Sequence, residues 1–254
     1  DARPDPQSQH YCLMARPHRS DVAADRTLER RSPSATLRWI AAAGALLGAM
    51  LYSNWLLEMA FTRSLPDPDL FISELAATDQ PHGEWFRGCD LAAAVILLVA
   101  AAAALVGIRR DRWSRTGWWA LAVFAVTTAL DSTVWTLVCA PSSDASCATR
   151  EATGAVPIGH QLHLLSSVVG VLAAIVSLFA FVVVDLRQRP PGRRVGLFLL
   201  AALIATSVWT TVAVAIDSAT GIGAAEVGIA QRVQLIAIAG WLIFVAVRTA
   251  RARA

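Results

Sequence analysis

The chain has 254 residues, of which 56% are hydrophobic and only 16% are charged, and its mean hydropathy is +0.51. These totals exclude an ordinary soluble domain, which does not need so many unbroken apolar runs, and they predict an integral membrane protein. The net charge of +3 says little about partners, because in a membrane protein the placement of charge matters more than its sum.

Residues 1–36 come first in the chain, and they are polar, rich in arginine and without hydrophobic periodicity. We expect a disordered basic tail on the cytoplasmic side. Such a tail suits attraction to anionic lipid, and nucleic acid is not an expected partner. Met14 resembles a native start, which would place residues 1–13 before the native chain.

Six apolar segments follow, each long enough to cross a hydrocarbon layer of roughly 30 Å at a helical rise of about 1.5 Å per residue. Alternating strand-length segments do not recur, so we predict an all-α polytopic bundle and not a membrane barrel. The six transmembrane helices are predicted over residues 37–58, 90–108, 117–140, 160–184, 195–217 and 228–248, with a short tail at 249–254.

The positive charges indicate the orientation of these helices. All 22 basic residues are arginines, and most lie before the first predicted helix, after the second and fourth, and after the sixth. By the positive-inside rule both termini are cytoplasmic, and the loops 59–89, 141–159 and 218–227 face outward. The bias toward arginine, alanine and valine suggests a bacterial genome, so we expect a multi-pass protein of the bacterial plasma membrane.

The two longer outward loops carry local signals. In the first, Phe71, Ile72 and Leu75 follow Asp69 at helical spacing, which predicts a short interfacial helix with Asp69 as its N-cap. In the second, two cysteines bracket the run "CAPSSDASC" on the oxidising side of the membrane. This arrangement predicts a disulfide between Cys139 and Cys147.

Ionisable residues within the spans are costly, by about 2.5–3.5 kcal/mol each on insertion scales, so each is a functional hypothesis. They are Glu58, Asp90, Asp131, His160, His163, Asp217 and Arg232. The predicted topology brings all seven into the outer half of the bundle and leaves none in the inner half. In the fourth helix, a stripe of polar and small residues at 160, 163, 167, 170, 174 and 177 predicts the seam with a neighbouring helix.

Several chemistries fit this set. His160 and His163, three residues apart on one helix, could bind a divalent metal such as zinc together with Asp131 and a water, which makes these three the candidate catalytic and metal-binding residues. The same residues could also perform metal-free acid–base chemistry, with a carboxylate fixing the tautomer of a histidine. Glu58, Asp90, Asp217 and Arg232 complete the polar cluster. The alternative reading is structural, with solvated histidines and an Asp217–Arg232 ion pair.

Four segments carry a resemblance to a known family: "FISELAATDQPHGEWFRGCD", "LDSTVWTLVCAPSSDASC", "GHQLHLLSSVVG" and "GIAQRVQ". They resemble the bacterial six-helix membrane family catalogued as domain of unknown function nine-nine-eight. That family is distantly similar to the Frag/DRAM/Sfk-type membrane proteins, although Ala76 and Ala77 stand where those carry a glycine. The resemblance implies the fold and a membrane location, and it supplies no reaction.

Three classes of function remain open. The first is a non-enzymatic protein that binds a lipid headgroup or a partner at an outward-facing polar cavity. The second is a metal-assisted hydrolase or transferase acting on membrane lipid, and the third is a small transporter. Membrane lipid is the expected partner in the first two, and a homo-oligomer is left open.

Overall fold

The structure is a computed structural model that describes residues 35–62, 69–107, 111–190, 192–220 and 226–252. The predicted tail at 1–36 therefore lies outside the described residues, except for its last two. The described residues form helices, turns and loops, and no strand occurs among them. The prediction of an all-α fold is confirmed.

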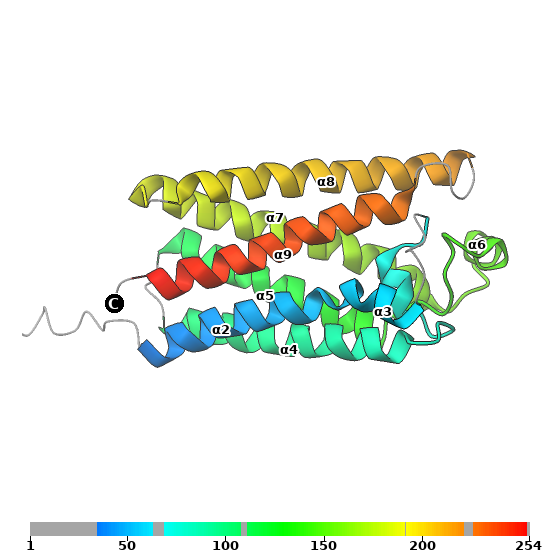
Figure 1. The fold of residues 1–254 in the computed structure, drawn as a ribbon, viewed down its shortest axis with the longest axis horizontal. Helices are drawn as coiled ribbons and strands as arrows, with labels where there is room; N and C mark the ends of the chain where they lie inside the picture. Colours follow the sequence, from blue (N-terminus) through cyan, green and yellow to red (C-terminus); the bar gives the residue numbers. More distant parts are fainter. Residues whose placement is uncertain (1–34, 63–68, 108–110, 191, 221–225, 253–254) are drawn as a thin grey trace, which may run out of the picture. The chain divides into compact units, whose positions relative to one another are not determined.

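Six long helices form a closed ring within the unit that begins at Pro33. Each packs against the next along the chain, and the last packs against the first, as can be followed in Figure 1. In order they are α2 (Ala35–Tyr52), α4 (Gly83–Gly107), α5 (Arg112–Thr133), α7 (Ile158–Gln188), α8 (Arg193–Thr220) and α9 (Val227–Arg251).

The middle of the ring is filled by apolar side chains. The Phe124 ring lies edge-on to the rings of Tyr52 and Trp241, with both centroid distances 5.2 Å, and Trp118 packs against Phe181. Many of the other buried residues are alanines, which allow helix backbones to approach closely. Aromatic rings and alanines therefore make up much of the described core.

Five of the described helices are long and apolar enough to cross a membrane, as a multi-pass membrane protein requires: residues 35–61, 83–107, 158–188, 193–220 and 227–251. The sixth predicted span corresponds to α5, which falls short of this standard. Its first turn carries Arg112 and Arg115, and its last turn is the polar run Asp131, Ser132 and Thr133. The sequence prediction counted residues 134–140 in this span, which raised its apparent hydropathy.

Helix α5 ends at Thr133 and not at residue 140. The hydroxyls of Ser132 and Thr133 bond to carbonyls one turn back, and Thr136 Oγ1 donates to the Asp131 carbonyl oxygen. Side-chain hydroxyls that compete for backbone carbonyls favour a helix end over its continuation. The following residues therefore turn away, and they lie at the end of the bundle.

Helix α4 begins at Gly83, seven residues before the predicted start at 90. A Cβ at Gly83 would lie 2.1 Å from the carbonyl oxygen of Ala77, so only glycine allows the loop to approach this first turn. Glu84 in the same turn suits the positive end of the helix dipole.

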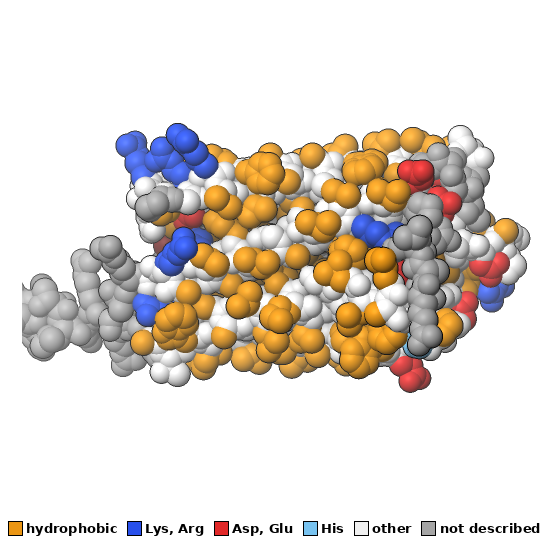
Figure 2. Space-filling model, viewed as in Figure 1, with side chains coloured by type: hydrophobic (Ala, Val, Ile, Leu, Met, Phe, Trp, Pro, Cys, Tyr) orange, Lys and Arg blue, Asp and Glu red, His pale blue; other side chains and the backbone are white. Residues whose placement is uncertain are grey.

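One end of the bundle carries the short elements and is called the loop end below; it is on the right in Figure 1. These elements are the 3-10 helices η2 (Asn54–Leu57) and η3 (Ile72–Ala76) and the α-helices α3 (Glu58–Thr62) and α6 (Ala145–Ala152). The opposite end is called the arginine end. Figure 2 shows arginine there and apolar side chains along the face between the two ends.

Two loop-end elements differ from the sequence predictions. The short helix in the first loop is present as η3, but its N-cap is Phe71, so the prediction of Asp69 is wrong. Helix α6, capped by the Asp144 side chain on Ser146 N–H, was not predicted at all. It lies within the run 141–159, which hydrophobic periodicity marked only as a loop.

Candidate functional site

The site at the loop end begins where α7 crosses the end of α5. A Cβ at Gly159 would lie 2.4 Å from the carbonyl oxygen of Val134, so glycine is needed for this approach. Further along, the Gly170 backbone passes close to Thr127, and Ser177 Oγ donates to the Gly117 carbonyl oxygen at 2.8 Å. The predicted seam of α7 lies against α5 at Gly170 and Ser177, whereas Ser166 and not Ser167 is the buried serine nearer its start.

This approach brings His163 beside Asp131. His163 Nδ1 lies 3.2 Å from the carbonyl oxygen of Trp135 and 3.3 Å from Oδ1 of Asp131. Both are acceptors, so Nδ1 carries a proton. Ser166 Oγ donates to the same Asp131 oxygen. Nε2 itself is buried without a hydrogen-bond partner among the described residues.

His160 is in a different state. Its side chain is fully buried, and its Nδ1 accepts a 3.0 Å hydrogen bond from Val138 N–H. The proton of the neutral ring therefore lies on Nε2, which faces the Glu151 carboxylate at 3.5 Å. His160 joins α7 to the loop after α5 and to α6.

The predicted metal site does not form in this arrangement. The lone pair of His160 is used by a backbone N–H, and a metal needs that lone pair. Among the residues that the structure describes, no group of three His, Cys, Asp or Glu side chains could hold a metal ion. Asp131 and His163 come together, whereas the His160 ring bonds to Val138 in the loop after α5.

Arg232 forms its salt bridge with Glu58. Its Nη2 lies 2.8 Å from Oε2 and 3.1 Å from Oε1 of that carboxylate, which is only 4% exposed. The Asp217–Arg232 pair considered in the sequence analysis is therefore wrong. Oδ1 of Asp217 is buried and has no hydrogen-bond partner among the described residues.

Asp90 accepts a 2.7 Å hydrogen bond from Asn54 Nδ2, which joins α4 to η2. Asp131 and His163 lie within electrostatic range of this carboxyl. Asp90 thus extends the polar cluster from α5 and α7 toward the first helix.

Glu74 of η3 fastens the two longer loops to each other. Its carboxylate is 2% exposed and accepts bonds from Ser142 N–H at 3.0 Å and Ser142 Oγ at 2.5 Å. Burial raises the pKa of Glu74 to about 7, partly opposed by these hydrogen bonds. Next to it, Ile72 N–H donates to Gln231 Oε1 of α9 at 2.5 Å.

A disulfide joins Cys139 and Cys147. The closed loop contains Ser142, the residue that Glu74 bonds. The cross-link and the buried carboxylate therefore fix the same short segment from two sides.

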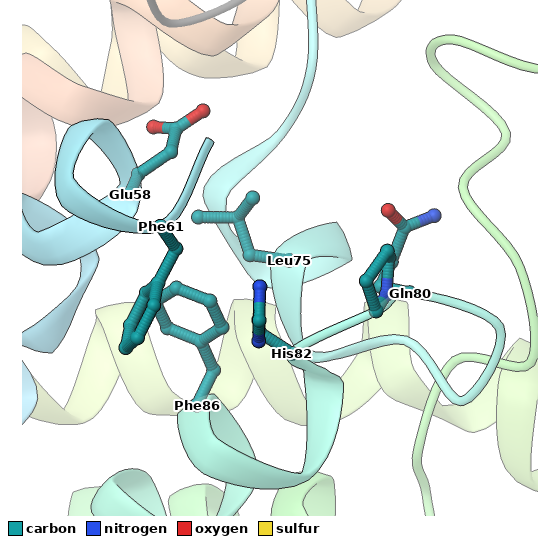
Figure 3. A pocket seen from close by; sticks show the side chains of 7 residues that line it. Glu58, Phe61, Leu75, Gln80, His82 and Phe86 are labelled. Atoms are coloured by element: carbon teal, nitrogen blue, oxygen red, sulfur yellow. The ribbon is translucent and has the colours of Figure 1, made fainter. Parts of the chain in front are cut away.

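A cavity of about 190 Å³ lies between α3, η3 and the start of α4. Figure 3 shows the rings of Phe61, His82 and Phe86 close together, with Gln80 on the other side of the cavity. Phe61 stacks on His82 with a centroid distance of 4.7 Å and lies edge-on to Phe86 at 5.9 Å. Glu58 also lines the cavity, so its described lining combines aromatic side chains with one carboxylate.

Sequence reasoning missed the cavity residues Phe61, Gln80, His82 and Phe86 and the loop fasteners Asn54, Glu74, Ser142 and Gln231. One signal was available for the cavity. His82 and Phe86 are four residues apart, which places them on one face of a helix, but the predicted helix began only at residue 90.

One buried ion pair lies at the arginine end. Arg248 Nε is 2.7 Å from Oδ1 of Asp185, which is buried in the last turns of α7. The expectation that the inner half holds no ionisable residue is therefore wrong. The predicted helix stopped at 184, one residue before this aspartate, whereas α7 continues to Gln188.

The comparisons with known proteins give the family. The model of the family described as "Protein of unknown function (DUF998)" matches residues 42–248. The chain belongs to the DUF998 family. No curated protein and no solved structure matches it.

The match spans almost the whole described bundle and includes every side chain of the site described above. The four segments that suggested DUF998 from the sequence all meet there. They are joined by Glu74–Ser142, Ile72–Gln231, Asp131–His163 and His160–Val138 contacts. In this DUF998 protein, the residues that carry the resemblance hold the loop end together.

Proposed function

We propose that this DUF998 protein spans the bacterial plasma membrane six times, with both termini cytoplasmic and the loop end outward, and binds a lipid headgroup in the loop-end cavity. The observation that carries the proposal is the cavity itself. It lies at a polar end of a bundle whose sides are apolar, where lipid headgroups are found.

The size and lining of the cavity favour a headgroup. Its volume of about 190 Å³ is below the roughly 300–1,000 Å³ of typical small-molecule pockets, so it suits a fragment of a larger ligand. Aromatic rings beside a carboxylate that is paired with Arg232 offer an apolar surface next to a polar group, which fits the small polar end of a lipid.

The role of α5 as the sixth span is supported by its neighbours. It packs between α4 and α7, which are both apolar enough to cross the membrane. A helix held between two spans over its whole length lies at the same depth as they do. Its polar last turn then falls at the loop end, beside His163.

Transport is a weaker reading. A carrier needs a polar path through both leaflets, and the ring axis is filled by Phe124, Trp241, Phe181 and Trp118. The buried Asp185–Arg248 pair at the arginine end is satisfied within the protein.

The test is a calorimetric titration of the protein in mild detergent, once with short-chain phosphatidylethanolamine and once with short-chain phosphatidylglycerol. We expect saturable binding of at least one lipid. Phe61→Leu and His82→Leu, which remove aromatic faces and keep apolar volume, should each weaken binding by about tenfold. The matched control is Trp39→Leu, since Trp39 is an exposed aromatic residue at the arginine end. Absence of saturable binding of either lipid would refute the proposal.

A second candidate function rests on the unpartnered Nε2 of His163. With Asp131 beside Nδ1, this nitrogen could take a proton from water, the hydroxide could attack a lipid ester, and the alcohol released would take the proton back. It ranks below headgroup binding because His163 is not among the residues that line the loop-end cavity.

This reading is tested by incubating the protein with labelled phospholipid and measuring the hydrolysis products. Turnover that is lost in His163→Gln and unaffected by chelators would support it. Turnover that is equal in the variant, or absent in both, would exclude it.

A further inference from the structure

Two arginines from different helices lie at one tryptophan ring at the arginine end. The ring belongs to Trp113, in the first turn of α5. The guanidinium carbon of Arg112 is 5.4 Å from the ring centroid, and that of Arg187, near the end of α7, is 5.8 Å from it. Cation–π attraction of about 0.5–1 kcal/mol at exposed sites favours these positions. Two positive charges are therefore held beside the same indole.

Neither guanidinium is neutralised by a salt bridge among the described residues, and both arginines are exposed. The two described acids of the arginine end have other partners. Asp111 Oδ2 accepts the Ser114 N–H at 3.0 Å, and Asp185 binds Arg248 Nε at 2.7 Å. Asp185 and Arg187 are two residues apart on one helix, so they do not face each other. The charge at the indole is thus left for an anion from outside the described chain.

The Trp113 indole also has an unused hydrogen-bond donor. Its Nε1 atom is buried and has no acceptor among the described residues. An unsatisfied buried donor is uncommon, because it costs about 1–3 kcal/mol. An anionic oxygen beside the two guanidiniums would supply the missing acceptor.

These three donor groups match a phosphate. A guanidinium donates through N–H groups that lie in its plane, so it can rest on an aromatic face and still bind phosphate oxygens. A phosphate offers enough oxygens for two guanidiniums and the indole N–H at once. A carboxylate has only two oxygens and fits three donor groups less well.

The surroundings favour the phosphate of a lipid over a dissolved ion. Phe179 of α7 lies edge-on to the Trp113 ring at a centroid distance of 5.9 Å, and it is 46% exposed. Further from the arginine end, other apolar side chains of α5 and α7 are exposed, among them Trp119, Val123, Val126, Leu172 and Val176. The site therefore borders the apolar side of the bundle, where the phosphates of a bilayer meet its hydrocarbon chains.

The charge of the arginine end favours an anionic lipid. The described part of this end holds two aspartates, Asp111 and Asp185, and nine arginines: Arg38, Arg112, Arg115, Arg187, Arg189, Arg193, Arg194, Arg248 and Arg251. Phosphatidylethanolamine would bring an ammonium group that these arginines repel, whereas phosphatidylglycerol keeps its net negative charge. Basic pockets between transmembrane helices on the cytoplasmic side are typical sites for anionic headgroups.

We propose that Arg112, Trp113 and Arg187 bind the phosphate group of an anionic phospholipid at the arginine end. The site lies at the opposite end of the bundle from the loop-end cavity, so it does not depend on a headgroup there. It adds a specific lipid contact to the diffuse attraction between the arginines and the membrane surface.

The test follows the Trp113 indole N–H by NMR in protein with isotopically labelled tryptophan, in a sugar-based detergent that contains no phosphate. Trp113→Phe removes one indole signal and so assigns it. Short-chain phosphatidylglycerol, short-chain phosphatidylethanolamine and inorganic phosphate are titrated separately. We expect phosphatidylglycerol to move the signal downfield, as for a donor that gains an acceptor. Its binding should saturate and be at least tenfold tighter than that of the other two.

Variants separate a defined site from diffuse charge. Arg112→Gln and Arg187→Gln should each weaken phosphatidylglycerol binding at the Trp113 signal about tenfold. Arg115→Gln is the matched control, because Arg115 carries the same charge on an exposed position of α5. At physiological salt, which largely screens exposed charges, it should weaken binding by less than about threefold. Phe61→Leu at the loop end should leave this signal and its affinity unchanged.

The absence of a saturable shift with phosphatidylglycerol would overturn the inference, and so would equal affinity for the two lipids. Equal affinity for inorganic phosphate would assign the site to a free ion and not to a lipid. An equal loss in Arg115→Gln and Arg112→Gln would reduce the binding to diffuse charge. A shift that disappears in Phe61→Leu would place the lipid at the loop end. The comparison of the three ligands uses the wild type, so it stands even where a variant fails to fold.

Discussion

Arg232 and Glu58 form a buried pair at the centre of the loop end, and the two side chains are 12% and 5% exposed. Removing one partner of such a pair leaves an uncompensated buried charge. We predict that Arg232→Met lowers the free energy of unfolding in detergent by about 3–5 kcal/mol. The double variant with Glu58→Gln should recover part of the loss.

Asp217→Asn is the matched control for this prediction, because Asp217 lies at a similar level but does not pair with Arg232. It should change the stability by less than about 1 kcal/mol. A loss as large as that of Arg232→Met would mean that Arg232 pairs with Asp217 in the membrane.

Glu74 makes the stability depend on pH. Its pKa is about 7 in the folded protein and near 4.5 when unfolded, so between these values the folded chain keeps a proton that the unfolded chain releases. The stabilisation from this proton is complete below pH 4.5 and is lost as the pH rises to about 7. Over this window the free energy of unfolding falls by up to about 3 kcal/mol. Thermal melts should therefore show Tm falling over this window, and Glu74→Gln should flatten the fall. If Tm falls equally with pH in the variant, the pH dependence comes from another group.

At the scale of the elements, the contact between α5 and α7 depends on the absence of a side chain at Gly159. We predict that Gly159→Ala separates the start of α7 from Val134, breaks the His160–Val138 bond and costs about 2 kcal/mol or more of unfolding free energy. Gly88→Ala in α4 is the control, since a Cβ there meets nothing within 4 Å. It should stabilise the protein by about 0.5–1 kcal/mol. If the two variants behave alike, the close approach at Gly159 has no energetic role.

The elements themselves were largely predictable, because a long apolar run has few alternatives to a helix. The stripe on α7 was also predictable, since helical spacing alone places Gly170 and Ser177 on one face. The end of α5 was not, because hydropathy does not register the hydroxyls of Ser132 and Thr136 that turn the chain. The burial of η3 was not predictable either, because it depends on the hydrogen bonds between Glu74 and Ser142 of another loop.

At the scale of the whole molecule, the sequence gives the depth of a residue in the bundle but not the direction in which its side chain points around the helix. Asp217 lies in the last turn of α8 and Glu58 is the first residue of α3, and α9 packs against both α8 and α2. Arg232 could therefore have faced either acid, and only the closed ring decides for Glu58. The cavity was unpredictable for the same reason, because its rings come from segments that meet only in the folded bundle.

The orientation of the bundle is tested by labelling intact cells with a membrane-impermeant maleimide. In a background of Cys12→Ser and Cys89→Ser, we expect Asp79→Cys at the loop end to react at once. Gln188→Cys at the arginine end should react only after the cells are permeabilised. Both positions are exposed in the structure. The reverse pattern would place the loop end in the cytoplasm and the positive-inside assignment would be wrong.

The most direct test of lipid binding at the loop end is a nuclear Overhauser measurement between a bound lipid headgroup and the phenylalanine rings. The protein would carry labelled Phe in detergent, and phosphatidylethanolamine and phosphatidylglycerol would each be offered with a labelled headgroup. We predict saturable cross-peaks from the headgroup methylenes of at least one of the two lipids to Phe61 and Phe86, and none to Phe198, which is exposed on α8. Saturable binding with cross-peaks only to other rings, or no saturable cross-peak at all, would contradict headgroup binding in this cavity.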